Sequence, residues 1–320
     1  MRVMSDKAAR NKTIDFSLED GQEYIKKCIR VEKEVSTDEV LDRIITGDSL
    51  KVMDLLPERS VDLMIVDPPY NIEKDFNGNR FHARSREKYR SYTEEWLSKA
   101  IPLLKDSASV YICCDWKSSL VIGDLLYDHL KVRNRITWQR EKGRGAKTNW
   151  KNGMEDIWFA TVSDRYTFNL EDVMIRRRVI APYTSGGKPK DWEDTAEGRF
   201  RNTCPSNFWD DISIPYWSMA ENTAHPTQKP EKLYAKLILA SSNKGDVVFD
   251  PFAGSGTAAV TSKKLDRHFI AVEKEALYCA WAEKRLENAL SDSTIQGYRD
   301  GVFWERNTGD AQRKLTKRSD

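Results

Sequence analysis

The stretch DVVFDPFAGSGTAAV, from Asp246 to Val260, decides which kind of sheet this chain builds. A short apolar run ends at an acid, Asp250, then two glycines follow at Gly254 and Gly256, and an alanine-rich helix pattern begins at once. Glycines in such a loop let the backbone turn tightly and approach a ligand closely. The stretch therefore predicts a doubly wound sheet that binds a ligand beyond the carboxyl ends of its strands.

Strand and helix patterns alternate along most of the remaining chain. Strands are expected at residues 43–47, 61–66, 108–114, 246–250 and 268–273, and helices at 49–57, 93–105, 231–242, 256–265 and 275–290. This alternation predicts an α/β fold with a mostly parallel sheet and helices on both of its faces. Regularity fails between about Arg140 and Thr223, where Gly, Pro, aromatic and basic residues are frequent, so we expect a functional or inserted region there.

Composition limits the class of protein. A length of 320 residues exceeds the usual single domain, and the net charge of +2 means that any basic footprint for nucleic acid has to be local. The five cysteines form no C-x-x-C pair and only four histidines are present, so we predict no metal site. Without a signal-peptide core or a membrane-spanning apolar run, a cytoplasmic protein is expected, with no membrane partner.

The glycine loop favours an adenosyl ligand. Glu273 ends the next strand, HFIAVE, where its carboxylate is well placed to accept hydrogen bonds from ribose hydroxyls. The third glycine of the dinucleotide pattern is replaced by Ala259 or its neighbours, which disfavours a nicotinamide dinucleotide and favours a smaller ligand without a pyrophosphate. The alternative is an ordinary tight turn between a strand and a helix.

A second strand ends in unusual chemistry. VDLMIVDPPYNI, from Val61 to Ile72, passes from a buried strand pattern directly into Asp67-Pro68-Pro69-Tyr70. Prolines lack an N–H group and fix φ, so they hold the neighbouring carboxylate and carbonyl rigidly. The alternative is a simple strand terminus, since Asp and Pro often stop strands.

Three motifs together resemble those of one enzyme family. DPPY, then HPTQKP from His225 to Pro230, then DPFAGSGT are similar in kind and order to the motifs of the β-class DNA amino methyltransferases. The resemblance covers roughly Ile44 to Leu290 and implies a Rossmann-like methyltransferase fold that uses S-adenosyl-L-methionine. It divides the chain into an extension without an assigned role (1–40), a target-base half (41–163), a target-recognition region (164–222), a cofactor half (223–295) and a C-terminal tail (296–320).

The resemblance also implies a reaction and its catalytic residues, Asp67, Pro68, Pro69 and Tyr70. A base swung out of double-stranded DNA would receive the methyl group on its exocyclic amine by direct in-line transfer. The Asp67 carboxylate and the Pro68 carbonyl would accept the two amino hydrogens, and Tyr70 would stack on the base.

Cofactor-binding residues carry over from the same motifs. In HPTQKP, Lys229 is expected to pair with the cofactor's carboxylate, although this segment could also simply start a helix. Asp48 and Ser49 correspond to a position near the adenine, although Gly-Asp-Ser is also an ordinary helix cap. The predicted set is Asp48, Ser49, Asp67, His225, Thr227, Gln228, Lys229, Asp250, Phe252, Ala253, Gly254, Ser255, Gly256, Thr257 and Glu273.

The first residue of the tetrad bears on the target base. Within the family Asp usually accompanies adenine N6 and Ser accompanies cytosine N4, so Asp67 favours adenine and leaves cytosine as the alternative. C5 methylation requires a nucleophilic cysteine in a Pro-Cys pair, and the chain has only the reverse order, Cys204-Pro205. RNA or protein-glutamine methyltransferases usually carry Asn in place of Asp67. A non-catalytic DNA-binding module predicts damaged motifs, and these are intact.

Basic residues predict where DNA binds. One cluster follows the tetrad and a second spans Lys131 to Lys151, and both are interpreted as phosphate contacts. Others lie in the recognition region, where arginine could read guanine. The candidates are Arg80, Arg84, Arg86, Lys88, Arg90, Arg140, Lys142, Arg144, Lys147, Arg176, Arg177, Arg178, Lys188, Lys190, Arg199 and Arg201. The resemblance further implies a homodimer and either a cognate restriction endonuclease or a solitary role.

Overall fold

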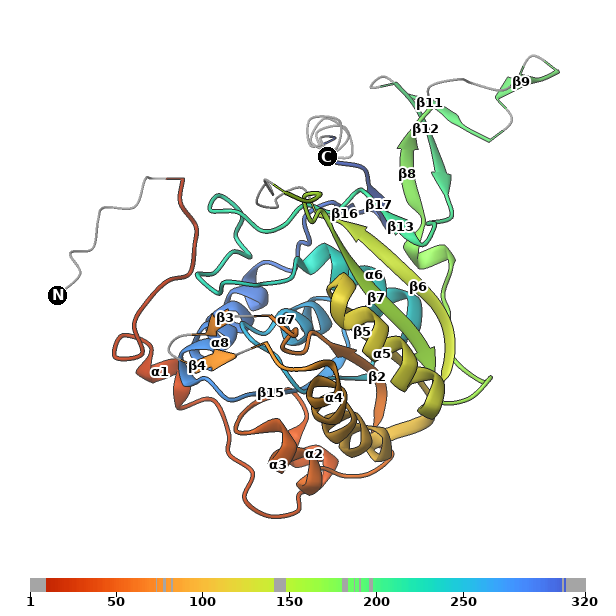
Figure 1. Cartoon of the computed structure of the whole chain (residues 1–320). Coiled ribbons are helices and arrows are strands. Elements are labelled where there is room, and N and C mark those ends of the chain that lie inside the picture. The colour runs from red at the N-terminus through yellow and green to blue at the C-terminus, as the bar shows by residue number, and fades with distance from the viewer. Residues whose placement is uncertain are drawn as a thin grey trace.

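An eight-stranded sheet forms the centre of the computed structural model, which describes residues 10–72, 74–76, 79–81, 83–140, 148–179, 184–186, 188–189, 191–195, 198–306 and 308 (Figure 1). Five neighbouring strands run parallel, and the expectation of a mostly parallel sheet is confirmed. One strand, β7, is antiparallel to both of its neighbours. In spatial order the strands are β1 (Arg43–Thr46), β15 (His268–Glu273), β14 (Val247–Asp250), β2 (Val61–Val66), β5 (Leu104–Cys114), β7 (Met154–Thr161), β6 (Lys131–Gln139) and β13 (Phe208–Trp209).

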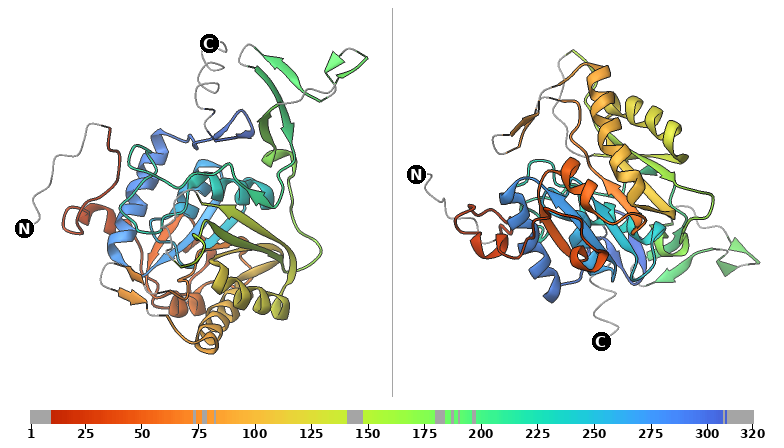
Figure 2. Two further views of the ribbon diagram at one scale, coloured as in Figure 1. Left: turned by 45° about the horizontal axis from the view of Figure 1, so that its top comes forward. Right: turned by 90° about the horizontal axis from the view of Figure 1, so that it is seen from below.

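Helices cover both faces of this sheet (Figures 1 and 2). One face carries α4 (Arg86–Ala100) and α5 (Trp116–His129), and the other carries α6 (Glu231–Ser241), α7 (Thr257–Lys264) and α8 (Ala276–Ser291). Along β2, Met64 and Val66 pack with the first pair, whereas Leu63 and Ile65 pack against α6. A strand buried on both faces has to be apolar, which is why Leu63 to Val66 form a continuous apolar run, while Asp62 at the start of the strand pairs with Lys105.

The loop from β14 to α7 depends on its second glycine. Gly256 has a φ of +77°, and a Cβ there would lie 2.6 Å from the Cβ of Ala282 on α8. Glycine at this position therefore satisfies both a left-handed backbone and the close packing of α7 against α8. Glycine is therefore needed at position 256 for the packing of the two helices, whether or not a ligand binds to the loop.

Substituting this glycine should destabilise the fold. Gly256→Ala is expected to lower the free energy of unfolding by roughly 2–4 kcal/mol, the sum of a left-handed alanine and an overpacked contact. Gly245→Ala is the matched control, because Gly245 has a φ of +83° with nothing within 4 Å of its Cβ position. It should cost only about 1 kcal/mol in urea-induced unfolding. Equal losses in the two variants would show that the Ala282 contact is unimportant.

A second sheet lies over the outer side of α6. Its strands, in spatial order, are β11 (Glu193–Thr195), β12 (Gly198–Thr203), β8 (Ile175–Arg178), β17 (Val302–Trp304) and β16 (Tyr298–Arg299). Ile175 and Phe303 pack against Ala235 and Leu239 of α6. Residues 298–304, expected in a C-terminal tail, thus join the region expected to recognise the target, and the ribbon of β8 and β12 projects from the body (Figure 1).

Short elements complete the described part. They are the helices α1 (Gln22–Ile25), α2 (Thr37–Val40) and α3 (Ser49–Val52), the 3₁₀ turns Met53–Leu55, Ile101–Leu103 and Glu171–Val173, and the two-stranded ribbons β3 (Lys74–Phe76) with β4 (Asn79–Phe81) and β9 (Thr184–Ser185) with β10 (Lys188–Pro189). Within the described ranges, no helix has the length and apolar character to cross a membrane, and no group of three His, Cys, Asp or Glu residues is placed to hold a metal ion.

The N-terminal extension supports the HPTQKP segment. Lys12 N donates to Trp217 O at 2.7 Å, Ile14 N donates to Asn222 O at 2.9 Å, and Ala224 N donates back to Ile14 O at 2.9 Å. Residues 12–14 thus lie beside the chain that leads directly into His225. This gives the extension a structural role that its sequence did not indicate.

Candidate active site

Two acids predicted to act in the site lie at the same edge of the central sheet. Asp67 directly follows β2 and Glu273 ends β15, and these two strands are parallel to β14, which lies between them. The antiparallel strand β7 begins at the same edge, so its second residue, Glu155, joins them. Carboxyl ends of parallel strands are the usual ligand site of such sheets.

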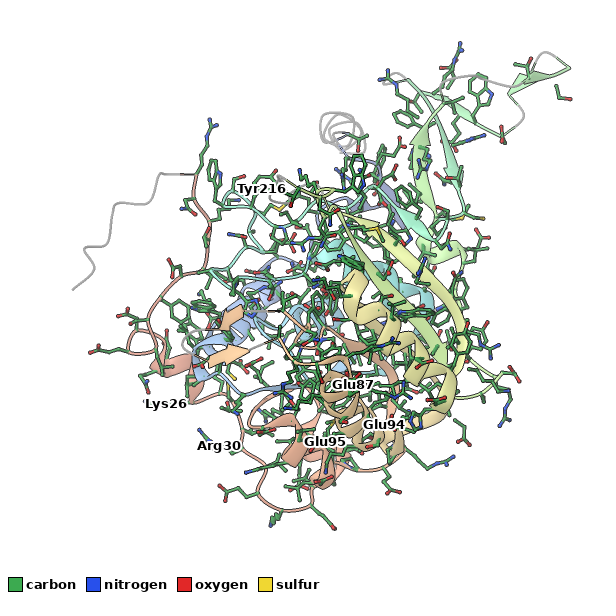
Figure 3. The ribbon with its side chains drawn as sticks, viewed as in Figure 1. Lys26, Arg30, Glu87, Glu94, Glu95 and Tyr216 are labelled. Atoms are coloured by element: carbon green, nitrogen blue, oxygen red, sulfur yellow. The ribbon has the colours of Figure 1, made fainter. Side chains whose placement is uncertain are left out.

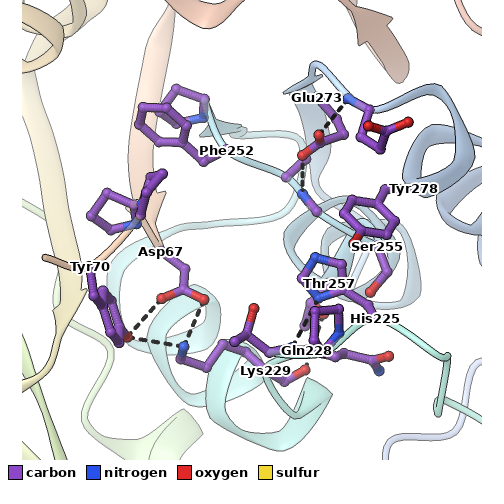
Figure 4. A pocket seen from close by; sticks show the side chains of 18 of the residues that line it. Asp67, Tyr70, His225, Gln228, Lys229, Phe252, Ser255, Thr257, Glu273 and Tyr278 are labelled. Carbon is purple, nitrogen blue, oxygen red and sulfur yellow. Dashed lines mark hydrogen bonds and ion pairs between the residues drawn. The ribbon is translucent and has the colours of Figure 1, made fainter. Parts of the chain in front are cut away.

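A cavity of about 670 Å³ opens at this edge. Its walls include the HPTQKP segment, the glycine loop and the tetrad, which precedes the other two by more than 150 residues (Figure 4). Apart from Asp250 and Gly256, every predicted cofactor-binding residue lines it. The volume is within the usual range for a small-molecule site.

Glu273 is fixed by backbone donors. Gly254 N donates to one carboxylate oxygen at 2.8 Å and Glu275 N donates to the other at 2.7 Å. Burial raises the pKa of Glu273 to about 7, and the backbone hydrogen bonds only partly offset it. The carboxylate is therefore oriented towards the cavity, with lone pairs left to accept hydrogen bonds from a ligand.

This pKa predicts a pH dependence of ligand binding. A ligand whose hydroxyl groups donate to Glu273 needs the ionised carboxylate, so its affinity should rise roughly tenfold from pH 6 to pH 8. In Glu273→Gln the affinity should be lower and nearly flat over this range. Glu95→Gln, at an exposed carboxylate of α4 that does not line the cavity, should behave as wild type (Figure 3). Fluorescence titration of adenosyl ligands measures this, and an unchanged slope in Glu273→Gln would contradict it.

The HPTQKP segment is held by its own side chains. Gln228 Oε1 accepts from Thr223 N at 2.9 Å, and Gln228 Nε2 donates to Glu221 O at 2.6 Å. The ring of His225 packs edge-on against Tyr278 at 4.4 Å, and a Cβ on Gly254 would lie 3.1 Å from His225 Nε2. Gln228 therefore shapes the cavity wall chiefly by fixing the loop, while His225 lies directly beside the glycine loop.

Asp48 and Ser49 line the cavity and also have the structural roles considered as alternatives. Asp48 caps α3, since its carboxylate accepts from Leu50 N at 3.1 Å. The hydroxyl of Ser49 donates to Pro251 O, which connects the end of β1 to the end of β14.

The structure places Asp250 and Gly256 behind the cavity wall. Asp250 accepts from Phe252 N at 3.0 Å, and burial raises its pKa to about 8. It thus shapes the start of the glycine loop from within. Any contact of these two residues with a cofactor stays a prediction from the resemblance.

A cluster of paired charges occupies the other end of the cavity (Figure 4). Lys229 Nζ lies 2.6 Å from Asp67 Oδ2, 3.1 Å from Tyr70 Oη and 3.2 Å from Glu155 Oε2. Tyr70 Oη donates to Asp67 Oδ1 at 2.8 Å. Arg140 pairs with the remaining oxygen of Glu155. Two carboxylates are thus balanced by two cations in a closed group.

Protonation states in this cluster follow from its charges. Burial lowers the pKa of Lys229, but the carboxylates of Asp67 and Glu155 outweigh it, and the net effect is a raised pKa. Burial, reinforced by the same two carboxylates, raises the pKa of Tyr70 well above its ordinary value. Both groups therefore remain hydrogen-bond donors to Asp67 at neutral pH.

The sequence did not identify two features of this cluster. Lys229 was expected at the cofactor's carboxylate, whereas its ammonium here contacts the tetrad. Glu155 was not named at all, because the neighbours of its strand are β5 and β6, and neither of these ends in one of the motifs. The ring of Tyr92, on α4, also lines the cavity and was not predicted.

Several arginines predicted to bind DNA belong to internal contacts. Arg176 lies over the rings of Phe200 and Trp304, at 5.4 and 5.6 Å, and donates to Glu193 at 2.7 Å. Arg177 donates to Glu305 at 3.2 Å. In contrast, Arg178, Arg199 and Arg201 are exposed on the projecting ribbon.

The basic residues that follow the tetrad also comprise some that are exposed and some that make internal contacts. Arg84, Arg86 and Lys88 are exposed at the start of α4, whereas Arg90 donates to Asp124 and Asp128 of α5, each at 2.7 Å. Arg140 belongs to the cavity. At the opposite end of β6, Lys131 and Arg133 both pair with Asp164, away from the cavity. Lys142, Arg144, Lys147, Lys190 and the side chains of Arg80 and Lys188 lie outside the described residues.

Comparison with known proteins assigns this architecture to a family. Residues 61–284 match the family described as DNA methylase, which comprises N6 and N4 methyltransferases. Type II methyltransferase M.HpaI of Haemophilus parainfluenzae is 32% identical over 252 residues, covering 78% of this chain and 75% of that protein. DNA adenine methyltransferase YhdJ of Escherichia coli strain K12 is 32% identical over 253 residues, covering 77% and 83%. The chain belongs to the N6/N4 DNA methylase family.

Solved structures agree on the fold. The complex of M1.HpyAVI with S-adenosylmethionine has a TM-score of 0.53 and 25% identity, and covers 76% of this chain and 98% of that one. The cytosine-N4-specific PvuII DNA methyltransferase has a TM-score of 0.59 over 83% and 95% of the two chains, at 15% identity. The fold is thus that of the S-adenosylmethionine-dependent DNA methyltransferases.

The cavity fits S-adenosylmethionine as the cofactor. The oriented carboxylate of Glu273 suits the ribose hydroxyls, and the aromatic rings of Phe252 and Tyr278 provide flat walls. Phe252 is itself held by an edge-on contact with Trp96 at 5.8 Å.

Proposed function

We propose that this enzyme methylates the N6 amino group of adenine in double-stranded DNA. The observation that carries the proposal is the position of Asp67, which opens onto the same cavity as Glu273. Support also comes from the printed name of the Escherichia coli relative, a DNA adenine methyltransferase. Cytosine N4 is the second candidate, because the PvuII enzyme has the same fold. An aspartate rather than a serine at position 67 favours adenine.

The tetrad would act by holding the amino group. The carboxylate of Asp67 and the carbonyl of Pro68 accept its two hydrogens, which favours a pyramidal nitrogen with its lone pair directed at the methyl donor. The two prolines fix these acceptors at the end of β2. Bound S-adenosylmethionine supplies an electrophilic methyl group on its sulfonium. The methylated nitrogen must then lose one proton, and Asp67 is the base in contact with it.

DNA would approach with the target base extruded from the helix, since a stacked base does not reach a cavity of this kind. The ring of Tyr70 is available to stack on the base while its hydroxyl remains bonded to Asp67. The exposed arginines of the projecting ribbon, Arg178, Arg199 and Arg201, are proposed to contact the duplex. A two-stranded ribbon has the dimensions to enter the major groove.

The proposal also covers two kinds of partner, a restriction endonuclease and a second copy of this chain. The chain serves either beside a restriction endonuclease of the same specificity or alone, and mapping the methylated sequence distinguishes these roles. A cognate endonuclease has to be blocked by the mapped methylation. The homodimer implied by the resemblance would be detected by sedimentation velocity.

Product analysis tests the proposed function. Purified protein is incubated with methyl-labelled S-adenosylmethionine and unmethylated genomic DNA, and the digested nucleosides are identified by mass spectrometry. Label in N6-methyladenine is the expected result. Label in N4-methylcytosine would overturn the choice of base, and DNA without label would overturn the proposal itself.

A further inference from the structure

Both oxygens of the catalytic carboxylate are already occupied. Asp67 Oδ1 accepts from Tyr70 Oη at 2.8 Å, and Asp67 Oδ2 accepts from Lys229 Nζ at 2.6 Å. The side chain of Lys229 is only 7% exposed, so no bulk water replaces a lost partner there. Each oxygen keeps a second lone pair, so an amino group can bind Asp67 beside these donors, but it meets the full negative charge of the carboxylate only when the ammonium moves away.

The displaced donor needs another acceptor. An ammonium left unpaired in a buried site is strongly unfavourable, and a tyrosine hydroxyl without a partner is also costly. Among the described residues, one further carboxylate oxygen lies within reach of both donors: Glu155 Oε2 is 3.2 Å from Lys229 Nζ and 3.2 Å from Tyr70 Oη. A small shift of the ammonium thus exchanges one carboxylate for the other.

Glu155 is built to hold this position. Its side chain is 5% exposed, and Arg140 pairs with its other oxygen, Oε1. That pairing turns Oε2 towards Lys229 and Tyr70. Arg140 also keeps the group balanced, because without it the cluster would carry two negative charges and one positive charge.

We propose that Glu155 is a positioning residue that receives the ammonium of Lys229 when the amino group of the target base binds Asp67. The exchange involves only hydrogen bonds and ion pairs, and no covalent bond changes. Before the base arrives, Lys229 neutralises Asp67. Once the base is bound, Asp67 is released to accept its amino hydrogen. The inference rests on the proposed function, since it assigns a step in base binding to the same site.

The test is a cycle of variants measured by single-turnover methylation of DNA. Glu155→Gln retains an acceptor oxygen but lacks the charge, so Lys229 remains on Asp67 and the rate should fall roughly 30- to 100-fold. The dissociation constant of the cofactor should stay near that of wild type. Glu155→Asp, which keeps the charge, should recover part of the rate.

The decisive comparison is made without the lysine. In a Lys229→Met background no ammonium needs a second partner, so adding Glu155→Gln should change the rate by less than about threefold. The double variant also removes one charge of each sign, which favours folding over an unpaired buried charge. Asp156→Asn is the control for loss of a buried carboxylate on the same strand, since Asp156 is 2% exposed and does not line the cavity.

Each outcome has a separate meaning. A fall in rate for Glu155→Gln that disappears in the Lys229→Met background supports the exchange. An equal fall in both backgrounds, or none in either, overturns it while wild type still methylates DNA. Wild type that transfers no methyl group to DNA overturns the proposed function instead. Thermal melting of every variant separates loss of fold from loss of rate.

Discussion

Asp67→Ala is expected to reduce the single-turnover rate of DNA methylation by roughly 10³-fold. On the proposed mechanism, the variant loses the acceptor that orients the amino group and the base that takes its proton. It also leaves Lys229 with Glu155 as its remaining carboxylate partner among the described residues, which further disturbs the cavity. The rate is measured with saturating cofactor, so that binding and chemistry are separated.

Cofactor binding should survive this change. Glu273 lies at the far end of the cavity, so the dissociation constant of S-adenosylmethionine should change by less than about tenfold, or 1.4 kcal/mol. Asp54→Ala removes an exposed carboxylate that pairs only at the surface with Lys99, at 2.5 Å, and should behave as wild type. A rate for Asp67→Ala within a few-fold of wild type would eliminate the amino clamp.

Asp211→Asn is expected to have the largest effect on stability, a loss of roughly 3–5 kcal/mol in the free energy of unfolding. Asp211 is buried between Lys232 and Lys236 of α6, with each ammonium 2.7 Å from one of its oxygens. Lys232 also donates to Trp304 O of β17 at 2.5 Å. The carboxylate therefore joins the recognition region, the cofactor half and the C-terminal strand.

The pH dependence of this contribution has a definite sign. Burial alone would raise the pKa of Asp211, but the two lysines outweigh it and lower the pKa to about 2. The stabilisation is therefore complete above the ordinary carboxyl pKa near 4, and it is lost as the pH falls through about 2. Urea unfolding at pH 7 and at pH 3 should show a smaller difference for Asp211→Asn than for wild type.

A second substitution identifies the cause. One carboxylate serves two ammonium groups, and burial lowers the pKa of Lys236 to about 8 because Asp211 does not compensate it fully. Adding Lys236→Met to Asp211→Asn removes one unpaired charge and should restore part of the stability. No recovery would mean that the loss comes from packing and not from charge.

Much of the central sheet could be predicted because its signals are local. The run LMIV, from Leu63 to Val66, is apolar at every position since β2 is buried on both faces there, and the glycine loop marks its own strand and helix. The motifs also predicted the cavity, because parallel strands place their carboxyl ends at one edge. The position of Asp67 and Glu273 at the cavity follows from this rule alone.

What escaped prediction depends on contacts between distant segments. Glu155 reaches the cavity since β7 enters the sheet antiparallel beside β5, which no local pattern specifies. Likewise, Arg176 lies over the ring of Trp304 only because β17 pairs with β8, where Phe303 lies opposite Ile175, 128 positions earlier in the chain. The sequence pattern around a basic residue in a strand is the same whether its side chain contacts DNA or packs on an aromatic ring.

The order of strands in the central sheet has a consequence for synthesis of the protein on the ribosome. The early strands β1 and β2 are separated in the sheet by β15 and β14, which are translated some 180 residues after β2. A nascent chain therefore carries an open edge on β2 until residues 247–273 emerge, and such edges invite wrong pairing. The cavity accordingly forms only after residues 247–273 have been translated.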